Sequence, residues 1–325
     1  MDAVEKFQLL IEDGLERLRG ELNDKPRELF EPLNYMLSLG GKRVRPLLTL
    51  FACDLFDGDV SSALNQAIAI ELFHNFSLIH DDIMDNAPLR RGMPTVHQKW
   101  NNNIAILSGD ALLVKAYQYV CKGGSGQVME IFNEMALNVC KGQQWDMNFE
   151  KKDQVSIAEY VRMIELKTAD LLAASLGIGA LMAGARKEDA ERVFEFGKNI
   201  GIAFQLQDDM LDAYGKEDKF GKQKGGDIIA NKKTYLLIKA LELSKHNAYK
   251  KEELYQWIYS DVHDGKQKVE AVTAIYDFLN VKNLTTDEMK RYYLKGISCL
   301  DGIPVNKEKK ENLIRWIEGL VNREL

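Results

Sequence analysis

The chain has 325 residues, of which 46% are hydrophobic and 28% are charged, with a net charge of −6 and a pI near 5.6. The apolar fraction is large enough for a sizeable core and excludes a largely disordered chain. Proteins that bind the nucleic-acid backbone usually carry a basic face. The acidic balance and the absence of a long basic run therefore argue against a nucleic-acid partner.

The four cysteines, Cys53, Cys121, Cys140 and Cys299, are far apart and form no CxxC pair. We therefore predict buried thiols in a reducing compartment, with neither a disulfide framework nor a zinc site. The N-terminal segment carries acids early and lacks the apolar core of a signal peptide. The longest uncharged stretch, 171–185, is shorter than the ~20 residues that span a bilayer. The sequence predicts a cytoplasmic protein with no membrane span.

The spacing of prolines and apolar residues predicts helices along most of the chain. No proline lies between Pro94 and Pro304, and this interval is rich in Ala, Leu, Lys and Glu. One helical face near the N-terminus is formed by Val4, Phe7, Leu10, Ile11, Leu15 and Leu18. Further helices are expected at 61–85, 103–122, 126–149, 156–182, 188–214, 231–245, 249–262, 267–279, 286–299 and 307–323.

No run of alternating β-branched residues bounded by hairpin turns is present, so the predicted fold class is all-α. Glycine pairs at 40–41, 123–124 and 225–226 are expected where helices stop. Because no Ser/Pro-rich linker or internal repeat separates two halves, we predict one domain over residues 1–325. Its motifs lie in 40–234, and its C-terminal part, 249–325, reads as a solvated helical layer. The small residues of 171–185 suit a central helix against which others pack.

The segment SLIHDDIMDNAPLRRG carries a first group of aspartates. Asp81 and Asp85 are four residues apart and share one face of a helix, with Asp82 about 100° round from Asp81. Apolar residues precede and separate these acids, which indicates a partly buried helix end. A DDxxD string alone is more often acidic helix surface than a ligand site.

The segment GIAFQLQDDMLDAYG repeats this spacing with Asp208, Asp209 and Asp212. If the two helices are neighbours, up to six carboxylates share one pocket, which requires counterions. Carboxylates without clustered Cys or His suit Mg²⁺ or Mn²⁺, and Mg²⁺ is often completed by waters and phosphate oxygens. We therefore predict two acidic walls that hold a diphosphate through bridging metal ions.

Small basic groups flanked by glycines follow both acidic clusters and precede the first. Each pair, taken singly, is more often a solvated surface pair or a helix cap, but their interleaving with the acids indicates a diphosphate site. A lysine inside an apolar helix, Lys167, also requires a partner. The other basic residues are Lys42, Arg43, Arg45, Arg90, Arg91, Lys222, Lys224, Lys232 and Lys233.

The ordered motifs GGKRVRP, DDIMD, LRRG, GQQWD, KTADL, FQLQDDMLD, FGK, GGDI and NKKT make the chain resemble the trans-isoprenyl diphosphate synthases (polyprenyl synthetases) from about Gly40 to Lys233. The resemblance implies an orthogonal helical bundle around a central cavity, and a homodimer. It also implies a Mg²⁺-dependent head-to-tail condensation of isopentenyl diphosphate with dimethylallyl, geranyl or farnesyl diphosphate. The products are pyrophosphate and an all-trans C15–C20 prenyl diphosphate, as in short-chain farnesyl or geranylgeranyl diphosphate synthases.

Carried over by position, the resemblance also implies roles for individual residues. Isopentenyl diphosphate is bound by Lys42, Arg45, His74 and Arg91. The ligands of about three Mg²⁺ ions, for which Mn²⁺ can substitute, are Asp81, Asp82, Asp85, Asp208, Asp209 and Asp212. The cationic partners of the allylic diphosphate are Arg90, Lys167, Lys222 and Lys232. Thr168 and Gln205 stabilise the developing carbocation, and Gln143 and Asp146 line the site. Alternatively, His74 is an ordinary core histidine.

Three further expectations rest on the resemblance. The segment ANKKT has Asn231 where many relatives have glycine, and Asn can take the same left-handed conformation. The loop Lys222–Lys233 is expected to close over the bound phosphates and exclude water. Bulk upstream of DDxxD limits product length, which points to Phe73, Phe76 and Ser77. A helical wheel places Phe76 away from the Asp81 face, and both phenylalanines have an equally good reading as core aromatics.

Other readings of the same motifs remain open at this point. A long-chain (C30–C50) polyprenyl diphosphate synthase shares every motif. A class I terpene cyclase shares DDxxD, but its second metal motif is usually based on Asn, Ser and Glu. An HD-type phosphohydrolase, suggested by His80-Asp81, needs further histidines, and His97, His246 and His263 are not suitably paired. A non-catalytic subunit of a prenyl synthase would have lost aspartates or lysines, and none is missing.

Overall fold

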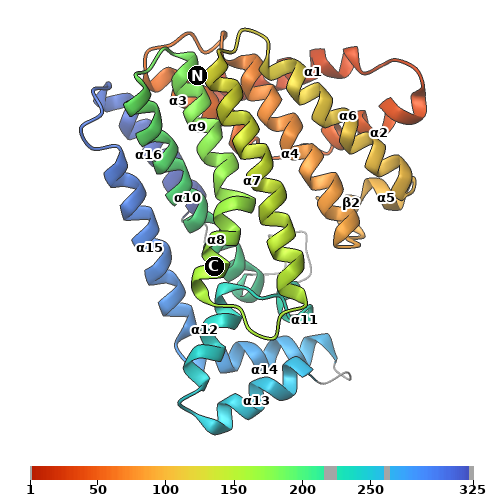
Figure 1. Cartoon of the computed structure of the whole chain (residues 1–325), viewed down its shortest axis with the longest axis vertical. Helices are drawn as coiled ribbons and strands as arrows, with labels where there is room; N and C mark the ends of the chain where they lie inside the picture. Colours follow the sequence, from red (N-terminus) through yellow and green to blue (C-terminus); the bar gives the residue numbers. More distant parts are fainter. Residues whose placement is uncertain (1, 216–224, 260–263, 322–325) are drawn as a thin grey trace. The chain divides into compact units, whose positions relative to one another are not determined.

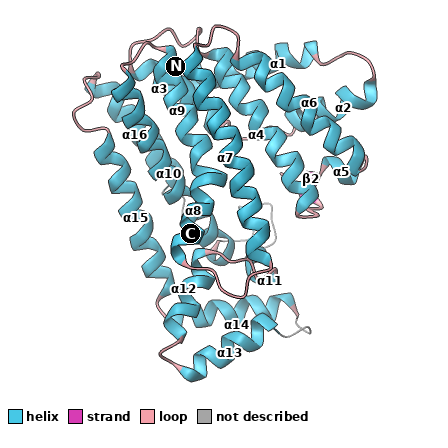
Figure 2. Cartoon of the chain, in the orientation of Figure 1, coloured by secondary structure: helices cyan, strands magenta, loops and turns pink. Residues whose placement is uncertain are grey.

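The computed structural model describes residues 2–215, 225–259 and 264–321, and helices make up most of these residues (Figures 1 and 2). The predicted all-α class is therefore confirmed. The helices from the N-terminus to α9 are α1 (Ala3–Glu21), α2 (Arg27–Ser38), α3 (Val44–Leu55), α4 (Leu64–Met84), α5 (Val96–Lys99), α6 (Asn102–Val120), α7 (Gly126–Glu150), α8 (Ile157–Ile164), the π-helix η1 (Glu165–Ala169) and α9 (Asp170–Met182). The later helices are α10 (Lys187–Tyr214), α11 (Gly226–Ile229), α12 (Tyr235–Ser244), α13 (Ala248–Tyr259), α14 (Gly265–Phe278), α15 (Val281–Cys299) and α16 (Lys307–Val321).

The chain divides into two compact units, each built from separate segments of sequence. Unit 1 comprises Met1–Leu137, Leu171–Gly197 and Leu300–Leu313. Unit 2 comprises Asn138–Asp170, Lys198–Cys299 and Ile314–Leu325. The helices α7, α10 and α16, and α9 through its first residue Asp170, contribute residues to both units.

Unit 1 is organised around α4, which packs along α6 and also contacts α1 and α3 (Figure 1). Its sequence is apolar for most of its length, so the helix can be buried on nearly every side. The helix α3 is buried almost throughout and carries Pro46 in its first turn, where a missing N–H costs little. A two-stranded hairpin, β1 (Leu89–Arg90) and β2 (Met93–Pro94), follows α4.

Unit 2 has its own apolar core, formed where α12 packs with α13, α14 and α15. In Figure 1 the helices α13 and α14 lie side by side, in agreement with their contacts. The core residues come from the apolar faces of these helices and from the end of α10, and include Met210, Leu236, Val272, Ile275 and Tyr276. The C-terminal helices therefore form a packed core in addition to the solvated surface that the sequence predicts for them.

The expected helices agree with the observed ones to within a few residues at most ends. The expected segment 156–182 is interrupted by the π-helix η1, and α12 begins at Tyr235 because Thr234 accepts the N–H of Leu237 as a cap. Four helices, α2, α3, α5 and α11, and the short hairpin were not predicted. Asn231 has a φ of 54°, so the left-handed conformation expected of it is confirmed.

Burial of the cysteines differs from the prediction. None of the four forms a disulfide within the described residues, but only Cys53 is buried, Cys299 is half-buried, and Cys121 and Cys140 are exposed. The prediction was wrong for the last three because a small apolar residue near a helix end or on an outer helix face need not turn inward. None of the helices formed by the described residues combines the length and hydropathy needed to cross a membrane.

The small residues of α9 let another helix approach closely. A Cβ at Gly179 would lie 2.1 Å from the carbonyl oxygen of Thr49 and 2.9 Å from the Cβ of Ala52, both on α3. A backbone oxygen cannot move aside as a flexible side chain can, so any side chain at Gly179 forces the two helices apart. The predicted role of this segment as a closely packed central helix is confirmed by the burial of its residues 171–180.

We expect Gly179→Ala to lower the free energy of unfolding by about 1–3 kcal/mol, because overpacking strains a filled core. Gly20→Ala is the matched control, since a Cβ there meets nothing within 4 Å. That change should leave stability unaltered or raise it by up to about 1 kcal/mol, as Ala has the higher helix propensity. Urea unfolding of the two variants measures both effects, and equal midpoints would contradict the close approach of α9 and α3.

Candidate active site

The first aspartate cluster occupies the C-terminal end of α4. Asp81 and Asp82 lie in its last turn, and Asp85 is the C-cap, with its N–H bonded to the carbonyl of Asp81. Negative side chains at this end of a helix are disfavoured because the unpaired carbonyls already carry partial negative charge. The cluster therefore requires positive charge from elsewhere in the fold.

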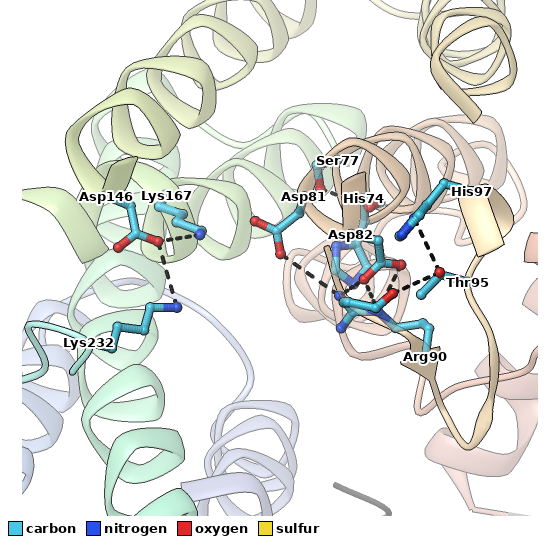
Figure 3. A network of polar contacts seen from close by, with 11 residues as sticks. His74, Ser77, Asp81, Asp82, Arg90, Thr95, His97, Asp146, Lys167 and Lys232 are labelled. Carbon is cyan, nitrogen blue, oxygen red and sulfur yellow. Dashed lines mark hydrogen bonds and ion pairs between the residues drawn. The ribbon is translucent and has the colours of Figure 1, made fainter. Parts of the chain in front are cut away.

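Arg90 supplies part of that charge (Figure 3). Its Nε donates to Oδ1 of Asp82 at 3.0 Å, and its Nη2 also contacts this carboxylate. The same Nη2 lies 3.8 Å from Asp81. Burial raises the pKa of Asp82, which is 2% exposed, while Arg90 acts to lower it. Asp82 is thus the inner member of the cluster, and the side chain of Asp81 is 22% exposed.

The hairpin β1–β2 directs two consecutive arginines to different partners. Leu89 pairs with Pro94 and Arg90 with Met93, which leaves Arg91 and Gly92 as a two-residue turn with φ of 55° and 75°. Positive φ at both positions is typical of a type I′ turn. Arg90 contacts Asp82, whereas the guanidinium of Arg91 lies against Gly41, where a Cβ would be 2.9 Å from it.

Arg45 and His74 form a second polar contact in unit 1. Nη1 of Arg45 lies 3.2 Å from Nε2 of His74. Burial, followed by the charges of Arg45 and Arg91, lowers the pKa of His74 well below its usual value. The imidazole is therefore neutral at pH 7 and can accept the hydrogen bond from Arg45. Arg45, His74 and Arg91 lie in the same unit, as the predicted isopentenyl diphosphate site requires, and Lys42 is exposed.

Arg43 has a different environment from its neighbours in GGKRVRP. It is 6% exposed, and its guanidinium donates to Glu71 at 2.7 Å and to Glu12 at 3.0 Å. Asn75 donates to the same Glu71 oxygen at 3.1 Å. The sequence groups Arg43 with cations for phosphate, but the structure uses it to attach the start of α3 to α4. One feature of the sequence could have indicated the ion pair between Arg43 and Glu71. Glu71 is the only charged residue in the apolar run AIAIELF, and a buried carboxylate needs a partner.

The second aspartate cluster lies near the end of α10, where Asp209 is buried. Its carboxylate accepts from the hydroxyl of Tyr160 and from Nε2 of Gln205, the latter at 3.1 Å. Oε1 of Gln205 accepts from the hydroxyl of Thr168 at 3.0 Å. Burial, with a smaller contribution from Asp227, raises the pKa of Asp209 to about 7. The chain of contacts fixes Gln205 and Thr168, the two residues expected to face the carbocation.

The π-helix η1 carries Lys167 and Thr168. Single π-turns within longer helices are frequent at functional sites. Nζ of Lys167 lies 2.7 Å from Asp146 on α7, and Nζ of Lys232 lies 3.8 Å from the same carboxylate (Figure 3). Burial acts to raise the pKa of Asp146, but the two lysines outweigh it and the pKa is lowered. The partner that the sequence required for Lys167 is thus Asp146.

Glycine allows α7 to approach the π-helix. A Cβ at Gly142 would lie 2.3 Å from the backbone nitrogen of Lys167, so any larger residue would push Lys167 away from Asp146. Gln143, the next residue, is half-buried.

Asp212 binds the segment that leads to Lys232. Its Oδ2 accepts the N–H of Asp227 at 3.0 Å, and its backbone carbonyl accepts the N–H of Gly225 at 2.9 Å. Lys232 in turn donates its N–H to the carbonyl of Asp227. Lys222 and Lys224, which the sequence places in this region, lie outside the described residues, whereas residues 225–233 of the loop expected to close are described.

The phenylalanines before the first cluster belong to a chain of aromatic contacts in unit 1. Phe73 is 1% exposed and contacts Phe76 at 5.4 Å and Phe132 at 5.7 Å between ring centroids. Phe76 is half-buried and packs against His80 at 4.8 Å. Ser77 donates its hydroxyl to the carbonyl of His74. Phe73 therefore supports Phe76 from the core.

The donors of both clusters suit Mg²⁺. Among the described residues, no three His, Cys, Asp or Glu side chains are grouped so that they hold a metal by themselves. A Mg²⁺ ion takes few ligands from protein side chains, because it keeps several waters and is commonly completed by substrate phosphates. The all-carboxylate character of the clusters fits an ion that binds together with a diphosphate.

Several supporting residues were not singled out from the sequence. These residues contact the predicted site residues and are not themselves part of the predicted site. Their partners are determined by tertiary packing and not by spacing in the sequence. They are Glu71, Asn75, Tyr160 and Asp227. Asp227 lies in the quoted motif GGDI, and this position was its only sequence signal.

Comparison with known proteins agrees with this arrangement. The polyprenyl synthetase family matches residues 26–276. The chain is 43% identical over 223 residues to a geranylgeranyl diphosphate synthase of Methanosarcina mazei, covering 67% of this chain and 69% of that protein. It is 34% identical over 310 residues to a geranylgeranyl diphosphate synthase of Saccharolobus solfataricus, covering 93% and 92%. The crystal structure of geranylgeranyl pyrophosphate synthetase from Pyrococcus horikoshii matches with a TM-score of 0.89 at 33% identity, covering 98% of this chain and 99% of that one.

These matches do not favour the terpene cyclase or the long-chain synthase. The family match covers most of the chain and includes both aspartate clusters. The chain therefore belongs to the polyprenyl synthetase family of prenyltransferases.

Proposed function

We propose that the protein condenses isopentenyl diphosphate head to tail with an allylic diphosphate, releasing pyrophosphate and forming the C20 product geranylgeranyl diphosphate. The observation that carries this proposal is that each DDxxD motif interacts with a cationic side chain of its own unit. Asp82 pairs with Arg90, and the charge of Lys232 acts to lower the pKa of Asp209. The names of the two relatives support the C20 product, within the C15–C20 range that the sequence predicts.

The aspartate clusters are proposed to act on the allylic diphosphate together with metal ions. The carboxylates that would hold about three Mg²⁺ ions, or Mn²⁺ in their place, are those of the two motifs. When bound, Mg²⁺ supplies positive charge to the diphosphate oxygens and makes pyrophosphate a better leaving group. Arg90, Lys167, Lys222 and Lys232 add cationic contacts to the same oxygens.

The cationic residues of GGKRVRP and the hairpin are proposed to bind the second substrate. Lys42, Arg45 and Arg91 contact the diphosphate of isopentenyl diphosphate, and His74 assists as a neutral imidazole. Because an uncharged imidazole can both donate and accept, it bonds a phosphate oxygen without adding a charge that repels Arg45. Arg43 supports this site by holding the motif to α4.

Chain elongation requires one bond to break and one to form. The C1–O bond of the allylic substrate breaks, and its electron pair leaves with pyrophosphate. The double bond of isopentenyl diphosphate then attacks C1, and the proton lost from the adduct passes to pyrophosphate. Thr168 and Gln205 present oxygens near the developing positive charge, and Asp209 with Tyr160 holds Gln205 in place.

The two units are proposed to act as one catalytic domain, with Phe76, supported by Phe73 and next to Ser77, limiting the length of the product. We also propose a homodimer that works in the cytoplasm. The exposed apolar side chains Ile106, Leu107 and Val114 on α6 support a dimer, since such residues gather at interfaces.

Removing one carboxylate from either cluster tests the proposed reaction. With Mg²⁺, labelled isopentenyl diphosphate and a farnesyl primer, we expect Asp81→Asn and Asp208→Asn each to lower kcat by about 10²–10³-fold, because each weakens charge stabilisation of the leaving group. Asp13→Asn, at an exposed position of α1, is the control. The proposal is wrong if the unaltered protein forms no product, or if either motif variant keeps full activity.

Phe76→Ala tests the chain-length assignment. Loss of the ring removes bulk upstream of Asp81, so we expect products longer than C20, sized by chromatography after dephosphorylation. Phe278→Ala removes a ring that is 61% exposed and should leave the product distribution unchanged. An unaltered C20 product from a well-folded Phe76→Ala enzyme would show that the ring serves the core alone.

A further inference from the structure

The C-terminal third contains a buried lysine that the proposed mechanism does not use. Lys268 on α14 is 6% exposed, and burial lowers the pKa of its ammonium. Its Nζ donates to the carbonyl of Ile229 at 3.1 Å and to Oδ1 of Asn231 at 2.8 Å. Among the described residues it forms no ion pair with a carboxylate.

A charged ammonium inside a protein is costly unless its N–H groups are bonded. The acceptors of Lys268 are two residues apart in sequence, with Ile229 at the end of α11 and Asn231 in the segment between α11 and α12. If the lysine leaves, the carbonyl of Ile229 and the amide oxygen of Asn231 lose their partner. The lysine and this segment therefore hold one another in place.

The segment needs such support because its backbone turns sharply. Asn231 adopts a φ of 54°, a left-handed conformation that favours glycine over other residues. Its side chain is held on both sides, since Oδ1 accepts from Lys268 on α14 and Nδ2 donates to the carbonyl of Ile258 on α13. The next residue is Lys232, and the conformation of this turn therefore determines the direction in which the side chain of Lys232 leaves the backbone.

Close packing attaches the same segment to α14. A Cβ at Gly225 would lie 2.4 Å from Cγ2 of Val269, and a Cβ at Gly265 would lie 3.2 Å from Cδ1 of Ile229. The first glycine precedes α11 and the second begins α14. The helix α11 is thus held against α14 by the two close contacts at glycine and by the hydrogen bonds of Lys268.

We propose that Lys268 is a positioning residue, which fixes Asn231 and the end of α11 so that the ammonium of Lys232 stays beside Asp146 and Lys167. This inference rests on the proposed function, in which Lys232 binds the allylic diphosphate. It gives the C-terminal third, which carries no motif, a part in binding one of the two substrates. Isopentenyl diphosphate is bound by other residues, so the effect is selective.

Steady-state kinetics of Lys268→Met test the proposal. We expect KM for the allylic diphosphate to rise about tenfold, as displacement of a binding group by a fraction of its length has large effects. The KM for isopentenyl diphosphate should stay within about twofold. Lys268→Arg, which keeps the donors, should restore most of the allylic KM. Lys250→Met is the control, since this lysine pairs with Glu253 on α13 of the same unit.

A double-mutant cycle separates positioning from general stabilisation. If Lys268 acts through Lys232, then Lys268→Met in a Lys232→Met background should add little, because the interaction it supports is already gone. Penalties that simply add, an equal rise of both KM values, or an unchanged allylic KM in a folded variant would each overturn the proposal. Lack of product from the unaltered enzyme would instead overturn the proposed function.

A second variant covers the case in which Lys268→Met does not fold. Asn231→Gly keeps the positive φ and removes the side-chain acceptor. We expect the same selective rise of the allylic KM, smaller because the bond to Ile229 remains. Equal KM values for Asn231→Gly and the unaltered enzyme would contradict the proposed role of this contact.

Discussion

The structure depends on pairing buried carboxylates with cations that come from other elements. Asp82 at the end of α4 and Asp146 on α7 are both held by such partners, Arg90 in one case and Lys167 in the other. A helix end that carries several acids is unfavourable on its own, because the local dipole and the like charges act in the same direction. The site therefore needs the hairpin and the π-helix as much as it needs the aspartates, because these two elements position the positive charges of Arg90 and Lys167.

The site is supported by contacts that never reach a substrate. Arg43 is bound by Glu71 and Glu12 and thereby ties one motif to the helix that bears the next. In the other unit, Tyr160 holds Asp209, which in turn holds Gln205. Polar groups of this kind are buried at a cost that is offset only when all their bonds are made. These buried groups can therefore adopt only a small range of positions, and the same holds for the side chains that they orient.

Much of the fold and of the site follows from the sequence, because helical spacing and charge patterns are local properties. The long helices, the two aspartate clusters and the need of Lys167 for a partner could be predicted in this way. The left-handed Asn231 was expected from the family resemblance. The helix α2 escaped detection because Pro32 interrupts its pattern, and the hairpin because its strands are too short to alternate. The partners of Arg43 and Asp209 depend on tertiary packing, which cannot be predicted from the spacing of residues in the sequence.

The two-residue turn at Arg91 and Gly92 separates neighbouring arginines that the sequence prints as a pair. One guanidinium is directed to a carboxylate of α4, and the other lies against Gly41, which directly precedes Lys42. In evolution, a single-residue insertion or deletion in this turn would change the pairing register of the ribbon and with it both assignments. The positions of both guanidinium groups therefore depend on the length of this turn, whereas most surface loops tolerate changes of length.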